Sequence, residues 1–146
     1  MYRTRDTLIY AGLSGGVAAL GQQPFGLWPL TLVGLGVSLS LLLGAQTKKR
    51  ACLVGWATGT GYFAVALHWI VEPFLVDIGR HGWMAPFALL FLSGGLALFW
   101  AAAYTLARAT RQTILGWILA LFAAEFARGL ILTGFPWALV GHVWLG

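Results

Sequence analysis

Charged residues are few in this chain, and they stand in short groups separated by long uncharged stretches. The 146 residues include nine Lys and Arg and four Asp and Glu, and none of these falls within 7–47, 51–71 or 81–107. An apolar helix of about 20 residues crosses the roughly 30 Å hydrocarbon core of a bilayer. Each of the three stretches is long enough to do so, and the first is long enough to do so twice.

The composition supports a membrane protein and excludes two other classes. Apolar residues make up 60% of the chain and charged residues 9%, whereas an average soluble domain is about 25% charged. So few charges cannot cover a soluble globular protein, and so many apolar residues exclude a disordered chain. The net charge of +5 does not indicate nucleic-acid binding, because the basic residues form clusters between apolar stretches rather than a continuous stripe.

We therefore predict an all-α membrane protein with five transmembrane helices. Gln22-Gln23-Pro24-Phe25-Gly26 offers a turn that divides the longest uncharged stretch into two spans. The predicted helices cover residues 5–22, 27–45, 51–71, 84–106 and 113–132. The first of them is short and rich in glycine, which leaves three alternatives open: a tilted span, a re-entrant half-helix, or a signal peptide cleaved at Ala19-Leu20-Gly21.

The distribution of basic residues predicts the orientation of these helices. With five spans, one face receives the N-terminus and the second and fourth connections, which carry Arg3, Arg5, Lys48, Lys49, Arg50, Arg108 and Arg111. The connections and the C-terminal segment on the opposite face carry only Arg80. Because cytoplasmic loops carry an excess of Lys and Arg, we expect a cytoplasmic N-terminus and a C-terminal end on the outer side.

Two ionisable residues, Glu125 and Arg128, lie within the last predicted span. They are three residues apart and therefore share one helix face. An ionisable side chain inside a membrane is costly and marks a functional site by default. The simpler alternative is a mutually neutralising pair that fixes how the helix packs, with Arg128 extending outward. Positioning a functional loop is compatible with both interpretations.

Aromatic residues gather where the outer membrane boundary is predicted. Thr133-Gly134-Phe135-Pro136-Trp137 follows the last span, and its Gly and Pro end the helix there. Five of the eight Trp residues map to the outer boundary: Trp28, Trp69, Trp83, Trp137 and Trp144. An aromatic belt would account for some of them, but a belt alone would appear on both faces. The bias predicts a role at the outer leaflet, and Thr133 to Trp137 and Trp69 are the candidate residues for it.

Other polar and small residues give weaker signals. His68 and Glu72 are one helical turn apart and could act as acid and base, but no nucleophile accompanies them at a recognisable spacing, and an interfacial polar cap is simpler. Cys52 is the only cysteine, so it forms no internal disulfide and no metal-binding motif. We predict neither a metal nor a cofactor. Two G-x-x-x-G pairs, Gly12/Gly16 and Gly55/Gly59, would allow helices to approach closely.

Three segments of the chain form a recognisable combination. They are Pro24-Phe25-Gly26-Leu27-Trp28-Pro29, the stretch 55–70 ending in His68-Trp69-Ile70, and Glu125-Phe126-Ala127-Arg128-Gly129 followed by Thr133-Gly134-Phe135-Pro136-Trp137. Together they resemble bacterial apolipoprotein N-acyltransferases. The last segment is the most specific. The resemblance extends through most of the chain in the same order, and it departs at His142, where many family members have Tyr.

The resemblance implies a membrane-helix bundle with a cytoplasmic N-terminus, followed by a periplasmic nitrilase-like domain and a final span. Such enzymes of the bacterial inner membrane move an acyl chain from a phospholipid to the N-terminal diacylglyceryl-cysteine of a lipoprotein. The acyl group rests on a catalytic Cys as a thioester, helped by a Glu and a Lys.

None of these three catalytic positions is present in the 146 residues, and Cys52 lies beside Lys48, Lys49 and Arg50 on the predicted cytoplasmic face. We therefore expect residues 1–146 to be an N-terminal fragment that anchors the enzyme and gives its lipid substrate access, and that is inactive alone. Thr133 to Trp137, Trp69 and His142 are the candidate substrate-access residues, supported by Glu125 and Arg128. The alternative is a small non-enzymatic membrane protein or transporter subunit, which would need a polar path across the bilayer.

Overall fold

The computed structural model describes residues 4–110, 112–131 and 134–144. Within these ranges the chain is helical and contains no strand, so the predicted all-α class is confirmed. The five long helices are α1 (Thr4–Ala19), α2 (Trp28–Leu43), α3 (Lys48–Ala66), α6 (Ala85–Ala109) and α7 (Thr113–Leu130). The short helices are η1 (His68–Val71), α4 (Glu72–Leu75), α5 (Ile78–His81), η2 (Gly82–Met84) and η3 (Val140–Trp144).

The five long helices lie close to the five predicted ranges, and the largest difference is at α3. This helix begins at Lys48 rather than at 51, because the Thr47 side chain accepts a hydrogen bond from the backbone N–H of Arg50 at 3.2 Å and caps it. It also ends earlier than expected, at Ala66, where the chain continues into η1. The basic cluster therefore forms the first turn of the helix instead of preceding it.

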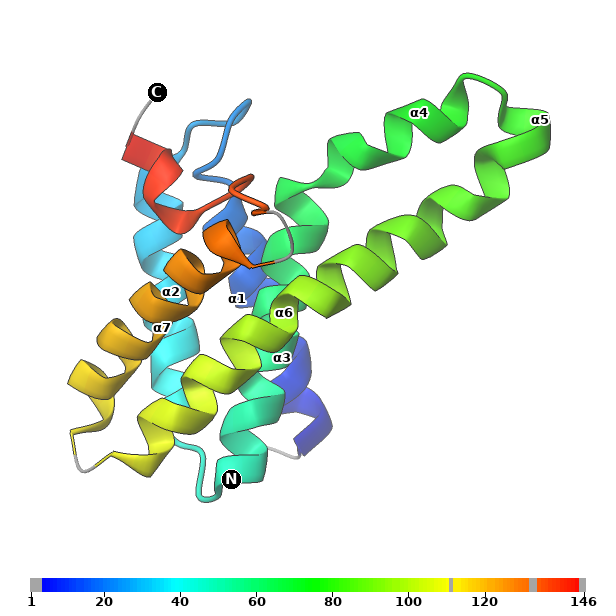
Figure 1. Cartoon of the computed structure of the whole chain (residues 1–146). Coiled ribbons are helices and arrows are strands. Elements are labelled where there is room, and N and C mark those ends of the chain that lie inside the picture. The colour runs from blue at the N-terminus through cyan, green and yellow to red at the C-terminus, as the bar shows by residue number, and fades with distance from the viewer. Residues whose placement is uncertain (1–3, 111, 132–133, 145–146) are drawn as a thin grey trace.

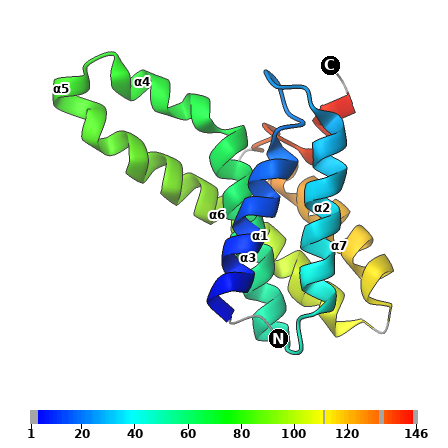
Figure 2. The ribbon, with the colours of Figure 1, turned by 180° about the vertical axis from the view of Figure 1, so that it is seen from behind.

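Glycines bring α3 into close contact with α1 on one side and α6 on the other. A Cβ atom on Gly61 would lie 2.0 Å from the carbonyl oxygen of Gly12 in α1. A Cβ atom on Gly55 would lie 2.7 Å from the carbonyl oxygen of Trp100 in α6, and one on Gly59 would lie 3.0 Å from Ala97. Close approach through the predicted pair Gly55/Gly59 is therefore present, whereas added Cβ atoms on Gly12 and Gly16 would make only ordinary contacts, at 3.7 and 3.5 Å. The helix α3 lies at the centre of the bundle (Figure 2).

Large aromatic side chains fill the space beside these glycines. Trp100 of α6 is fully buried and contacts Tyr62 and Phe63 of α3, with ring centroids 5.0 and 5.7 Å apart. Further along α6, the Tyr104 hydroxyl is hydrogen-bonded to Ser38 of α2. These two buried hydroxyls are thus paired between helices, as a low-dielectric interior favours.

The segment between α3 and α6 projects from the bundle as an arm. Figure 1 shows η1, α4, α5, η2 and the first turns of α6 extending away from the other helices. Its side chains are mainly apolar and exposed, including Val76, Ile78, Trp83 and Phe91. Such a surface is stable in contact with lipid and costly in contact with water.

Two helices in the described part of the chain are long and apolar enough to cross a membrane by length and composition. They are the stretch Ile78–Ala109, which contains α6, and Thr113–Leu130, which is α7. The helix α2 is apolar but shorter, with 16 residues. The described N-terminal and C-terminal ends lie at opposite ends of the bundle (Figure 1). The number of spans and their orientation remain predictions.

Candidate functional site

An ion pair lies buried at the end of α7. The Nη2 atom of Arg128 is 2.9 Å from Oε2 of Glu125, one helical turn earlier. Arg128 is only 1% exposed and the side chain of Glu125 13%. The three-residue spacing accounts for the contact, since such side chains are neighbours on one helix face. The guanidinium of Arg128 is buried and does not extend outward to solvent. The outward orientation that the packing interpretation predicted for Arg128 is therefore wrong.

Arg128 instead holds the chain segment that follows α7. Its Nη1 donates to the carbonyl oxygens of Phe135 at 3.0 Å and Trp137 at 2.8 Å, and its Nη2 donates to that of Ala138 at 3.3 Å. Its own carbonyl accepts from the N–H of Phe135 at 3.1 Å. One buried side chain thus binds three carbonyl groups within four residues of a non-helical segment, an arrangement suited to the fixed fork of donors on Arg.

The backbone turns sharply to make these contacts possible. Gly134 has φ +80°, and a Cβ atom there would lie 2.6 Å from the carbonyl oxygen of Gly129. Ala138 has φ +54°, a conformation that a non-glycine residue adopts at a cost. Glycine at position 134 therefore allows the chain to fold back over the end of α7, which itself ends earlier, at Leu130.

Both carboxylate oxygens of Glu125 accept hydrogen bonds from groups other than Arg128. Oε1 accepts from the indole N–H of Trp100 at 2.9 Å, and Oε2 accepts from the backbone N–H of Val140 at 3.0 Å. The guanidinium carbon of Arg128 also lies 4.9 Å from the centre of the Phe63 ring. Both charged side chains therefore make several contacts within the described part of the protein.

The candidate aromatic residues separate into a half-buried one and an exposed one. Phe135 packs against the hydrophobic core, whereas Trp137 is 60% exposed. The Trp137 ring lies 6.1 Å from the ring of Trp69 in η1, edge to face. Pro136, between Phe135 and Trp137 in the sequence, is exposed. Thr133 lies outside the described residues. The structure thus brings together Trp69 and Trp137, which are 68 positions apart.

His142 lies on the wall of an apolar groove between α7 and η3. The groove has a volume of about 670 Å³. Its lining residues are Leu35, Trp117, Ile118, Leu121, Phe122, Glu125, Phe126, Leu139, Val140, Gly141, His142 and Trp144. Because η3 forms one wall, the contacts that hold the segment leading into η3 also determine the shape of the groove.

The second predicted group, around His68, has a structural explanation. The Nδ1 atom of His68 is 2.9 Å from the carbonyl oxygen of Val65, in the last turn of α3. Its ring lies 6.1 Å from that of Phe25. Such a contact satisfies an unpaired carbonyl at a helix end. In the ranges that the structure describes, no group of three His, Cys, Asp or Glu is placed to hold a metal ion.

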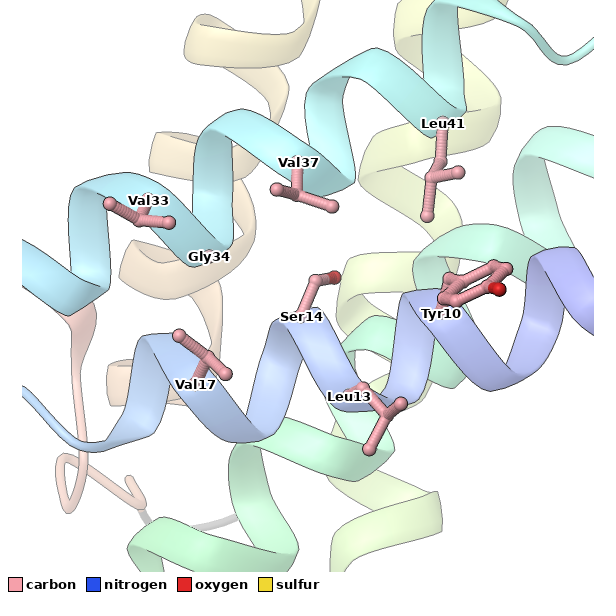
Figure 3. A pocket seen from close by; sticks show the side chains of 8 residues that line it. All are labelled: Tyr10, Leu13, Ser14, Val17, Val33, Gly34, Val37 and Leu41. Carbon is pink, nitrogen blue, oxygen red and sulfur yellow. The ribbon is translucent and has the colours of Figure 1, made fainter.

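A further groove, between α1 and α2, offers little chemistry. Figure 3 shows it between the two helices, with Ser14 and Tyr10 on α1 facing the side of Val37 and Leu41 on α2. Its volume is about 350 Å³. The Ser14 hydroxyl already donates to the carbonyl oxygen of Ala11 at 2.8 Å. The groove is otherwise apolar, so the candidate site is the one at the end of α7.

Sequence analysis missed Trp100 and Gln22 as partners of this site. Trp100 lies within a predicted span, away from the outer boundary, and no local pattern connects it with Glu125 25 residues later. Gln22 was placed where the first predicted helix meets the following turn, with no distant partner, yet its amide reaches the carbonyl oxygen of Leu139. Both contacts join segments distant in sequence, and the only available signal was a polar atom in an apolar surrounding.

Comparison with known proteins identifies relatives of this chain. The family described as apolipoprotein N-acyltransferase N-terminal domain matches residues 14–146. The chain is similar to the apolipoprotein N-acyltransferases of Caulobacter vibrioides, Brucella suis and Rhodopseudomonas palustris, with identities of 44% over 140, 41% over 145 and 36% over 143 residues.

These alignments include 90–92% of the chain but only 26–27% of each relative. The chain therefore spans about a quarter of the length of the relatives it matches. The matched residues include Glu125, Arg128 and the segment 134–144. The chain belongs to the apolipoprotein N-acyltransferase N-terminal domain family.

Proposed function

We propose that residues 1–146 form the transmembrane domain that anchors an apolipoprotein N-acyltransferase in the bacterial inner membrane and guides its phospholipid substrate. The enzyme transfers an acyl chain from that phospholipid to the N-terminal diacylglyceryl-cysteine of a lipoprotein. Family membership supports the class of reaction. The observation that carries the access role is the buried Glu125–Arg128 pair, which holds segment 134–140 so that Trp137 stays exposed beside Trp69.

The chain's own residues contribute binding and orientation to this reaction. Trp69 and Trp137 offer flat apolar surface next to a polar backbone turn, a combination that suits the boundary between headgroups and acyl chains. The groove beside His142 offers a second apolar surface along α7. Arg128 acts as a positioning residue, because its Nη1 and Nη2 atoms donate to carbonyl oxygens of the segment.

In this proposal, the residues that form and transfer the acyl thioester lie outside residues 1–146. Cys52 is the only cysteine, is half-buried and lies in the second turn of α3. The site at the end of α7 lies at the other end of the bundle (Figure 1). A thioester on Cys52 would therefore form far from the segment that guides the lipid.

The first prediction separates anchoring from catalysis. A chimera in which this chain replaces the matched region of the Caulobacter vibrioides relative should transfer acyl groups to a lipoprotein substrate. The chain alone should neither transfer acyl groups nor acquire an acyl label from radiolabelled phospholipid. Label that appears on the chain alone and disappears in Cys52→Ser, or a membrane-inserted chimera that is inactive, would contradict the proposal.

The second prediction concerns the five-span topology that this function requires. A reporter active only in the periplasm should be active when fused after Gly146 and silent when fused after Lys49. The reason is the excess of basic residues on the face that contains the N-terminus. A fusion after Gln23 should resemble the fusion after Gly146, and the reverse pattern of activities would rule out this orientation.

A further inference from the structure

Gln22 occupies a buried position between three parts of the chain. It lies in the turn between α1 and α2 and is only 7% exposed. Its Nε2 atom donates to the hydroxyl of Tyr62 in α3 at 2.6 Å and to the carbonyl oxygen of Leu139 at 2.8 Å. The adjacent Gln23 is exposed. Two neighbouring amides in one turn thus have opposite environments, and only Gln22 reaches the C-terminal segment.

The carbonyl that Gln22 holds belongs to a peptide group that is also held at its other end. The C=O of Leu139 and the N–H of Val140 are parts of the same planar peptide unit. Gln22 donates to the former, and Glu125 accepts from the latter at 3.0 Å. This peptide unit leads into η3, and the same Leu139 carbonyl accepts from the N–H of His142 at 3.0 Å.

Side chains from opposite sides therefore fix the direction in which η3 begins. Tyr62, the second acceptor of Gln22, is itself fully buried, with its ring centroid 5.0 Å from that of Trp100. Trp100 in turn donates to Glu125. Gln22 and Glu125 are thus connected through the core as well as through the peptide unit they share. Rotation of that unit would break its hydrogen bonds with Gln22 and Glu125 and leave buried polar groups unpaired.

We propose that Gln22 is a positioning residue that fixes the start of η3 beside the turn between α1 and α2, and so sets the shape of the groove beside His142. Its relevance to lipid access rests on the proposed function, whereas its effect on η3 does not. Arg128 holds the segment from 135 to 138, and Gln22 with Glu125 holds the next peptide unit. Loss of Gln22 should therefore loosen η3 while the contacts of Arg128 remain.

The third prediction tests this on the 146-residue chain in lipid nanodiscs, by hydrogen–deuterium exchange. Gln22→Met keeps the volume of the side chain and removes both donated hydrogen bonds. Backbone amides of residues 139–144 should exchange about tenfold faster, because loss of two buried hydrogen bonds favours local opening. Exchange in α3 should not change. Gln23→Met is the matched control, and it should leave exchange in both regions unchanged.

A second variant keeps the test informative if Gln22→Met disturbs the whole fold. Gln22→Asn retains a polar amide but is one methylene shorter, so it cannot reach Tyr62 and Leu139 together. Faster exchange confined to residues 139–144 in this variant supports the proposal. Unchanged exchange there, or an increase no larger than that of Gln23→Met, overturns it. If η3 loosens but the chimera still transfers acyl groups at the normal rate, the positioning role stands and the access role of the groove fails.

Discussion

Arg128→Met should destabilise the helical bundle by about 3–5 kcal/mol, the range found when one member of a buried ion pair is removed. The substitution leaves Glu125 as a buried charge without its counter-charge, and it removes the donor to three carbonyl groups. The free energy of unfolding can be measured by circular dichroism during titration of the detergent-solubilised chain with sodium dodecyl sulfate.

Two further variants test whether the loss of stability in Arg128→Met comes from the ion pair. Arg80→Met removes a basic side chain that is exposed on the arm, and it should change stability by no more than about 0.5 kcal/mol. Adding Glu125→Gln to Arg128→Met should recover part of the loss, because the neutral amide tolerates burial without a partner charge. A loss for Arg128→Met as small as that for Arg80→Met would show that the buried pair contributes little to stability.

The helices of this protein could be located from the sequence because their strongest signal is local. Long uncharged stretches bounded by charge clusters gave five ranges that agree with the five long helices. The ends were less accurate. Thr47 caps α3 ahead of the three basic residues, which hydropathy had placed outside the helix. Capping depends on a single side-chain contact, and a window of average hydropathy does not detect it.

The candidate site was predictable only where its contacts are local. The pairing of Glu125 with Arg128 follows from helical spacing. The contacts of Arg128 with the segment that follows depend on the positive φ angles of Gly134 and Ala138. Glycine at 134 signals such a turn, but alanine at 138 does not. Contacts with Gln22 and Trp100 arise from the packing of distant helices, for which one sequence carries no periodic signal.

Trp137→Ala should lower acyl transfer by the chimera about five- to hundredfold per inserted molecule. Trp137 is 60% exposed and contacts Trp69 by its ring edge, so most of its surface is available to a lipid. An aromatic contact of this kind contributes about 1–3 kcal/mol when fully buried, which gives the stated range if the contact is made in the transition state. The rate should be measured with purified lipoprotein and divided by the amount of inserted protein.

Phe135→Ala should act differently, because the two aromatic residues have different environments. Phe135 packs against the core, and its loss leaves a cavity that destabilises the fold. Its main effect should therefore be a lower amount of inserted protein. This prediction revises the equal roles that the sequence suggested for both residues, since the structure exposes one and half-buries the other.

Trp83→Ala distinguishes substrate access from a general aromatic belt. Trp83 is 68% exposed on the arm, comparable to Trp137. If exposed tryptophans only anchor the helices at the membrane boundary, both alanine variants should reduce insertion to a similar degree and leave the rate per inserted molecule unchanged. If Trp137 guides the acyl chain, only its variant should lower that rate. The difference depends on location, because Trp137 alone of the two lies on the segment held by Arg128.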